Sequence, residues 1–147
     1  MSNGYFMFPT PVNEPIRNFE KGSVDKKKLK EALARAKKTK VDVPMYIGSE
    51  EVRTGNTQSM HPPHEIKHNL GVFHKGEKKH ITQAINASLK ARSKWAAMPW
   101  EQRASIFLKA ADLIAGKYRY DMLAATMLGQ SKNAYQAEID STCEFID

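Results

Sequence analysis

Residues 103–114 read RASIFLKAADLI, and the spacing of their apolar side chains indicates their secondary structure. One face of an α-helix would carry Ala104, Phe107, Leu108, Ala111 and Ile114. Pro99 suits the first position of such a helix, and Gly116 can end it in a left-handed conformation. The stretch therefore predicts an amphipathic helix between this proline and this glycine.

Helical periodicity continues on both sides of this stretch. We predict a helix over residues 77–97 before it and another over residues 118–128 after it, ended by Gly129. A fourth helix is expected from about Lys132, and its apolar face would consist of Tyr135, Ile139, Cys143 and Ile146. That pattern has no stop signal before Asp147, so we expect a fragment rather than a finished domain.

The first half of the chain predicts a different organisation. Residues 1–22 contain three prolines and several aromatic residues, which favour an extended arm over a helix. A basic helix is expected from Ser23, its N-cap, to about Lys38. Residues 41–57 predict a β-hairpin that turns at Gly48 and Ser49.

Short strands are also expected near residues 58–61 and 69–74. These elements divide the chain into an arm over residues 1–22, a basic helix with a hairpin and short strands over residues 23–76, and amphipathic helices over residues 77–147. The sequence thus predicts a mostly α-helical chain with an N-terminal β-hairpin.

Basic residues are concentrated in one segment. The 147 residues include 23 Lys and Arg against 16 Asp and Glu, a net charge of +7. Residues 21–40 hold nine basic and two acidic side chains, which alone account for this excess. A solvated helix face is the simplest interpretation. Two alternatives are a nucleic-acid-binding module that acts through residues 21–40, and a helical interaction or regulatory protein without a ligand.

Cysteine content and hydropathy bear on location. A single cysteine excludes an internal disulfide framework and fits a reducing compartment. No apolar run approaches the ~20 residues of a membrane span. The first 16 residues lack the basic and apolar pattern of a signal peptide. These features predict a cytoplasmic protein without membrane contact.

Three possible sites are rejected on their chemistry. Gly71 and Gly76 have the spacing of a phosphate loop, but Glu77 stands where a lysine is required, so we attribute both glycines to a strand-to-helix turn. Cys143 lies beside acidic residues that would raise its pKa, which favours a buried structural thiol over a nucleophile. No paired ligand spacing supports a metal site among five clustered histidines, which we expect on the surface or in loops: His61, His64, His68, His74 and His80.

Several segments, taken in order, resemble the aldehyde dehydrogenase superfamily. They are ARSKW at 91–95, RASIFLKAADLI at 103–114 and GQSK at 129–132. A more specific match to one branch of this superfamily is the stretch QAEID at 136–140, which is followed by Glu144 and then by Ile146 and Asp147. Together with NEP at 13–15, KGS at 21–23 and GSEEVRT at 48–54, it resembles the 1-pyrroline-5-carboxylate dehydrogenase branch, also called L-glutamate γ-semialdehyde dehydrogenase.

The resemblance implies an α/β parent fold with a Rossmann-like NAD domain. Residues 77–147 would cover its cofactor-binding sheet, and NAD would be the cofactor. The Cys nucleophile and the Glu general base would lie beyond Asp147, so no catalytic, cofactor-binding or metal-ligating residue is assigned in this chain. The rest of the enzyme and, in a homo-oligomer, further copies would be its partners.

The reaction that the resemblance implies is the oxidation of L-glutamate γ-semialdehyde to glutamate in proline degradation. A thiolate attacks the aldehyde, a hydride passes to NAD, and the thioester is hydrolysed. Glu144 matches a family carboxylate expected near the ammonium group of this amino-acid aldehyde, with a solvated helix carboxylate as the alternative. We expect the 147-residue chain to be inactive by itself and to self-associate through exposed apolar helix faces.

Overall fold

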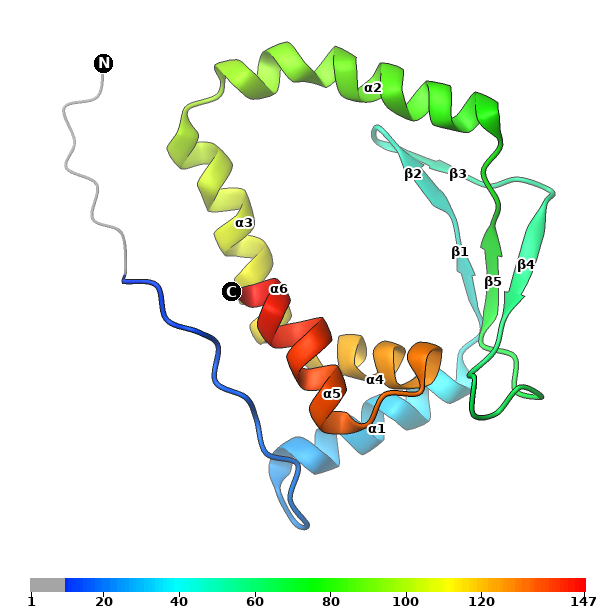
Figure 1. The fold of residues 1–147 in the computed structure, drawn as a ribbon, viewed down its shortest axis with the longest axis vertical. Coiled ribbons are helices and arrows are strands. Elements are labelled where there is room, and N and C mark those ends of the chain that lie inside the picture. Colours follow the sequence, from blue (N-terminus) through cyan, green and yellow to red (C-terminus); the bar gives the residue numbers. More distant parts are fainter. Residues whose placement is uncertain (1–9) are drawn as a thin grey trace.

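Six α-helices, one π-helix and five short strands make up residues 10–147, the part of the chain that the computed structural model describes (Figure 1). The helices are α1 (Val24–Lys38), α2 (Lys78–Ala97), α3 (Trp100–Ala115), α4 (Arg119–Gln130), α5 (Ala134–Glu138), the π-helix η1 (Ile139–Cys143) and α6 (Glu144–Ile146). The strands are β1 (Val41–Val43), β2 (Met45–Ile47), β3 (Glu50–Val52), β4 (Thr57–Met60) and β5 (Gly71–His74). The predicted mostly helical chain with short strands is confirmed.

The core lies where α1, α4 and α5 meet. Leu29 of α1 and Leu123 of α4 are buried against Ala137 of α5. The extended arm, residues 10–22, contains no helix or strand and packs Phe19 on this cluster. Residues 10–22 thus form no helix, as their prolines predict, while residues 1–9 and their aromatic side chains lie outside the described structure.

Helix α1 begins and ends as its sequence predicts. The Ser23 hydroxyl accepts a hydrogen bond from the backbone N–H of Lys26 at 3.1 Å, which satisfies one of the free amides of the first turn. Asp25 lies in the first turn, and basic residues lie in the last turn. Both placements complement the helix dipole.

The strands form two separate sheets. β2 and β3 pair antiparallel through a turn at Gly48, whose φ is 64°, so the predicted hairpin is confirmed for residues 45–52. The prediction is wrong for residues 41–43, which pair with β5 instead. β1, β5 and β4 form a three-stranded sheet in that order, in which β1 is parallel to β5 and β4 is antiparallel to it. The parallel pairing joins residues thirty positions apart, which no local pattern in the sequence indicates.

Gly71 is required by strand pairing rather than by a turn. It is the first residue of β5 and lies opposite Val41 with a φ of 135°. A Cβ at this position would be 1.9 Å from the carbonyl oxygen of Val41. The expectation that a strand-to-helix turn explains both glycines is wrong for Gly71, whereas Gly76 does lie between β5 and α2.

The ends of α3 and α4 differ from the predictions. Pro99 is the N-cap of α3 rather than its first residue, and Gly116 ends this helix with a φ of −105°, which is not left-handed. Gly129 lies inside α4. The left-handed residue after that helix is Ser131, with a φ of 57°. The left-handed position that ends α4 is thus occupied by Ser131 and not by Gly129, which the sequence predicts.

The last predicted helix is interrupted by a π-turn. Residues 139–143 form η1 between α5 and α6, and the wider turn presents three consecutive buried residues, Ser141, Thr142 and Cys143. The prediction of an apolar face was based on a single α-helical register. It is wrong for Tyr135, whose side chain is exposed at 60% relative accessibility. Ile139 and Cys143 of that face do turn inward.

Helices α2 and α3 leave much apolar surface uncovered. In Figure 1 they form an arch that begins above the strands and ends at α6. Several of their large apolar side chains are more than half exposed: Ile81, Ile85, Leu89, Ile106, Phe107 and Leu108. The predicted core face of α3 is thus not buried by residues 10–147. None of the described helices combines the length and hydropathy needed to cross a membrane.

Candidate functional site

A buried arginine lies at the centre of the most polar part of the structure. Arg119, the first residue of α4, is completely buried, and so is Glu138 at the end of α5. The Arg119 guanidinium donates to both carboxylate oxygens of Glu138, and its Nη1 lies 2.5 Å from Oε1 of Glu14 in the arm. Burial opposes the charge of Arg119, but the hydrogen bonds to Glu138 and Glu14 outweigh it and raise its pKa.

The arm is fixed over this ion pair by backbone and side-chain bonds. The backbone N–H of Arg17 donates to Glu138 at 3.0 Å, and its Nη1 donates to Asp25 at 3.0 Å and to the Tyr120 hydroxyl at 2.9 Å. The Tyr120 hydroxyl donates to Asp25 in turn. This bond, together with Arg17, outweighs burial and lowers the pKa of Asp25.

Cys143 is a buried structural thiol, as the sequence predicts. Burial, followed by the charge of Glu138, raises its pKa. The sequence pointed instead to Asp140, which pairs with Lys132, and to Glu144 as the acidic neighbours. A basic group does approach the thiol, because Nη2 of Arg119 lies 4.0 Å from Sγ. The net effect raises the pKa of the thiol and so disfavours the thiolate.

Glu144 follows the π-turn directly. It is the first residue of α6, it is exposed, and its backbone N–H donates to the carbonyl oxygen of Ile139 five residues earlier. Within residues 10–147 its carboxylate has no ion-pair partner. An exposed, unpaired carboxylate of this kind can bind the ammonium group of a ligand.

His80 is buried and the side chain of His74 is only 8% exposed, in contrast to the surface or loop placement that the sequence favours. His74 ends β5, and its Nε2 lies 2.8 Å from Oδ1 of Asp42. His80 forms a capping box with Glu77 at the start of α2. These bonds give both rings a structural role. In the described part of the chain, no three His, Cys, Asp or Glu side chains form a group that could hold a metal ion.

The basic residues of α1 mostly face solvent. Arg35 pairs with Asp121 of α4 at 2.8 Å, and Lys37 pairs with Glu65 at 2.5 Å. Both pairs are exposed and hold α1 against its neighbours. This arrangement fits the solvated helix face that the sequence favours.

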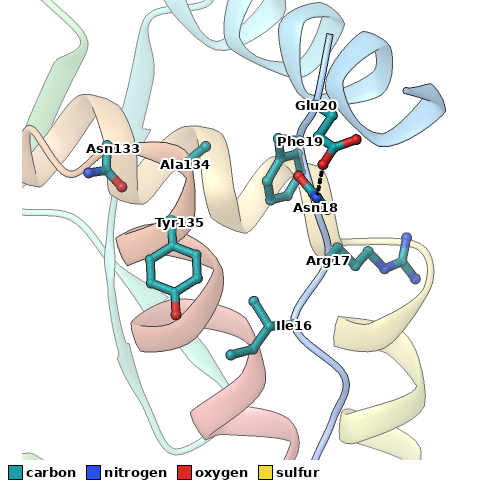
Figure 2. A pocket seen from close by; sticks show the side chains of 8 residues that line it. All are labelled: Ile16, Arg17, Asn18, Phe19, Glu20, Asn133, Ala134 and Tyr135. Atoms are coloured by element: carbon teal, nitrogen blue, oxygen red, sulfur yellow. Dashed lines mark hydrogen bonds between the residues drawn. The ribbon is translucent and has the colours of Figure 1, made fainter. Parts of the chain in front are cut away.

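A groove of about 730 Å³ separates the arm from the start of α5. Figure 2 shows Tyr135 and Ile16 on opposite sides of it, Arg17 directed away from Tyr135, and Asn18 bonded to Glu20. Neither Glu144 nor Cys143 lines this groove. It therefore lies apart from the candidate substrate carboxylate.

Known proteins share both the sequence and the geometry of this chain. Residues 50–147 match the aldehyde dehydrogenase family. The mitochondrial delta-1-pyrroline-5-carboxylate dehydrogenase of Dictyostelium discoideum is 45% identical over 95% of this chain and 25% of its own length. The delta-1-pyrroline-5-carboxylate dehydrogenase of Agaricus bisporus is 45% identical over 97% of this chain and 26% of its own length.

A solved structure extends the agreement to three dimensions. The Mycobacterium tuberculosis delta-pyrroline-5-carboxylate dehydrogenase, bound with NAD and cobalamin, superposes with a TM-score of 0.95 at 37% identity. The match covers 100% of this chain and 28% of that protein. This chain therefore spans about a quarter of the length of its relatives. The fold of residues 10–147 and the match over residues 50–147 together show that the chain belongs to the aldehyde dehydrogenase family.

Proposed function

We propose that this chain is the N-terminal portion of an NAD-dependent dehydrogenase that oxidises L-glutamate γ-semialdehyde, the open form of 1-pyrroline-5-carboxylate, to glutamate. The observation that carries the proposal is the 45% identity, over nearly the whole chain, to two relatives that are named for this substrate. No comparison supports a nucleic-acid-binding module acting through residues 21–40. The complete enzyme is residues 1–147 together with the remaining segments that the longer relatives contain.

Glu144 is proposed to select the substrate. The γ-semialdehyde of glutamate differs from a simple aliphatic aldehyde by its α-ammonium and carboxylate groups. The exposed carboxylate of Glu144 would pair with the ammonium group, and a charge-assisted hydrogen bond of this kind favours the amino-acid aldehyde. A plain aldehyde would gain nothing from Glu144.

NAD is proposed as the cofactor, but residues 10–147 do not fit it. Gly71 serves the pairing of β5 with β1, and Glu77 caps α2, where its carboxylate would repel a phosphate. Hydride acceptance is the chemistry that NAD supplies in such enzymes, and the residues that bind it are proposed to lie outside this chain.

The three segments are proposed to play distinct parts in the complete enzyme. The arm (residues 1–22) would be anchored at the start of α4 through Glu14 and Arg17. The basic helix with its strands (residues 23–76) would pack on α4 through α1, and the helices of residues 77–147 would cover the cofactor-binding sheet. The exposed apolar side chains of α2 and α3, such as Leu89 and Phe107, support this last assignment. A homo-oligomeric state is proposed for the complete enzyme on the resemblance alone.

The cytoplasm is the proposed location. The single cysteine fits a reducing compartment such as the cytoplasm, whereas the relatives from Dictyostelium discoideum and Emericella nidulans are named mitochondrial. Cell fractionation followed by immunodetection of the complete enzyme distinguishes the two compartments.

The function is tested by comparing substrates. We expect the purified complete enzyme to reduce NAD with L-glutamate γ-semialdehyde at a higher kcat/KM than with propanal, measured by absorbance of the reduced cofactor. An equal or lower kcat/KM with the amino-acid aldehyde would contradict the proposal.

A further inference from the structure

One guanidinium contacts both ends of the π-turn. Nη2 of Arg119 donates to Oε1 of Glu138, the residue immediately before η1, and lies 4.0 Å from Sγ of Cys143, the last residue of η1. Arg119 and Glu138 are both completely buried, and Cys143 is buried as well. The contact therefore joins two positions five residues apart from inside the protein.

Glu138 and Cys143 lie on the same side of the helix only because the π-turn between them is wider than an α-helical turn. In a regular α-helix, residues five apart point about 140° away from each other, since each residue advances the helix by about 100°. A π-turn bonds each residue to the fifth one before it, which brings such positions closer together in register. Arg119 can thus contact Glu138 and Cys143 at once in the observed turn, and not in a regular α-helix.

Local bonds favour the same geometry. The Ser141 hydroxyl donates to the carbonyl oxygen of Ala137 at 2.6 Å, and this carbonyl is the acceptor that the backbone N–H of Ser141 would use in an α-helix. The backbone N–H of Glu144 donates to Ile139, five residues back. Without the clamp at its two ends, the turn could relax to the α-helical register, and Glu144 would rotate by about one residue step, ~100°.

We propose that Arg119 is a positioning residue for substrate recognition: by clamping Glu138 and Cys143 it holds the π-turn that directs the Glu144 carboxylate at the ammonium group of the substrate. This inference rests on the role proposed above for Glu144. Arg119 is completely buried and touches no substrate in this arrangement. Its influence on the reaction passes only through the direction of Glu144.

Two substitutions in the complete enzyme separate this role from a general stabilising one. Arg119→Lys keeps the charge, but a lysine ammonium lacks the planar fork needed to bond Glu14, Glu138 and the thiol together. Glu138→Gln keeps the shape of the other partner and removes its charge. Arg35→Lys is the matched control, because Arg35 also joins α4 to another element through an acidic residue, Asp121, but on the exposed surface.

The readout is KM and kcat for L-glutamate γ-semialdehyde and for propanal, with near-UV circular dichroism to confirm folding. We expect Arg119→Lys and Glu138→Gln to raise the KM for the amino-acid aldehyde by about tenfold or more, because loss of binding contacts raises KM. The kcat with either substrate and the KM for propanal should stay within about twofold, and Arg35→Lys should change none of these values.

The outcomes distinguish this inference from the function on which it rests. If Glu144→Ala changes both substrates equally, the role of Glu144 fails and the inference fails with it. If Glu144→Ala is selective while Arg119→Lys and Glu138→Gln are not, the inference is overturned and the proposed function stands. Parallel losses with both substrates, or failure of both variants to fold, would assign Arg119 to the fold alone and overturn the inference.

Discussion

Nη1 of Arg119 lies 2.5 Å from Oε1 of Glu14, although 105 residues separate them in the sequence. This bond attaches the arm to the start of α4 at a point where the guanidinium has no exposed surface. Breaking one side of a buried ion pair leaves a charge without compensation. The arm is therefore an integral part of the ion-pair network rather than a loose terminal segment.

We predict that Glu14→Gln destabilises the complete enzyme by about 1–3 kcal/mol, because a hydrogen bond to a buried charge is lost while Glu138 still neutralises Arg119. Urea denaturation followed by tryptophan fluorescence measures the change. Glu20→Gln is the control, since Glu20 lies in the same arm and its carboxylate accepts a hydrogen bond from the exposed Asn18 two residues earlier. Equal denaturation midpoints for the two variants would contradict the prediction.

Glu144→Ala is expected to raise the KM for L-glutamate γ-semialdehyde by about tenfold to a hundredfold, as loss of one charge-assisted hydrogen bond implies. The KM for propanal should be unchanged, because propanal has no ammonium group. Steady-state kinetics with both aldehydes check this, with Glu31→Ala of the exposed face of α1 as the control. A similar rise in both KM values would remove the proposed role.

The stability of the arm should depend on pH through Asp25, whose pKa is lowered chiefly by the hydrogen bond from Tyr120. A carboxyl group with a lowered pKa stabilises the folded state above its unfolded pKa and loses this contribution as the pH falls through the folded value. Tyr120→Phe should therefore be less stable than the wild type at neutral pH.

The difference should shrink as the pH falls below 3.8, the ordinary pKa of an aspartate. Free energies of unfolding measured by urea titration at pH 7, 5 and about 3 follow this trend. Tyr46→Phe is a suitable control, because Tyr46 bonds to Glu51 at the exposed hairpin. A difference that stays constant down to the lowest pH would show that the Tyr120 bond does not act on Asp25.

Cys143 should resist alkylation in the folded protein, because burial raises the pKa of its thiol and keeps reagent away. Iodoacetamide labelling followed by mass spectrometry of the peptide that contains Cys143 measures this directly. Labelling should become rapid in urea. Rapid labelling under native conditions at neutral pH would contradict the buried placement.

The 147-residue chain, expressed alone, should reduce no NAD and should self-associate. The inactivity follows from the proposal that the nucleophile and the cofactor-binding residues lie elsewhere, and the association follows from exposed side chains such as Phe107 and Ile81. Light scattering after size-exclusion chromatography measures the mass. Turnover by this chain, or a sharply monomeric species that melts cooperatively, would overturn the respective expectation.

Local patterns in the sequence predict local elements well here. Ser23 as the N-cap of α1 and Gly48 in the hairpin turn are both confirmed, since each acts on its near neighbours. The π-turn was missed, because the predicted apolar face assumed one α-helical register and Arg119, which contacts both ends of the turn, lies in another helix. Gly71 was assigned to the wrong cause for a similar reason: the strand that approaches it contains Val41, thirty residues earlier.

In the candidate site, too, local features could be predicted from the sequence and long-range contacts could not. Glu144 could be singled out by resemblance, and the barrier to thiolate formation at Cys143 could be argued from its acidic surroundings. Arg119 could not be identified, because nothing in its sequence neighbourhood marks a buried cation. Its two partners, Glu14 and Glu138, lie in segments that come together only in the folded chain.

The order of synthesis gives the Arg119 network a further consequence. A ribosome releases Glu14 long before Arg119 and Glu138, so the arm has no docking site while most of this chain is being made. Its anchoring must wait until α4 and α5 have emerged. Attachment of the N-terminal arm therefore follows the synthesis of α4 and α5, and a chaperone that recognises extended segments would find residues 10–22 accessible until then.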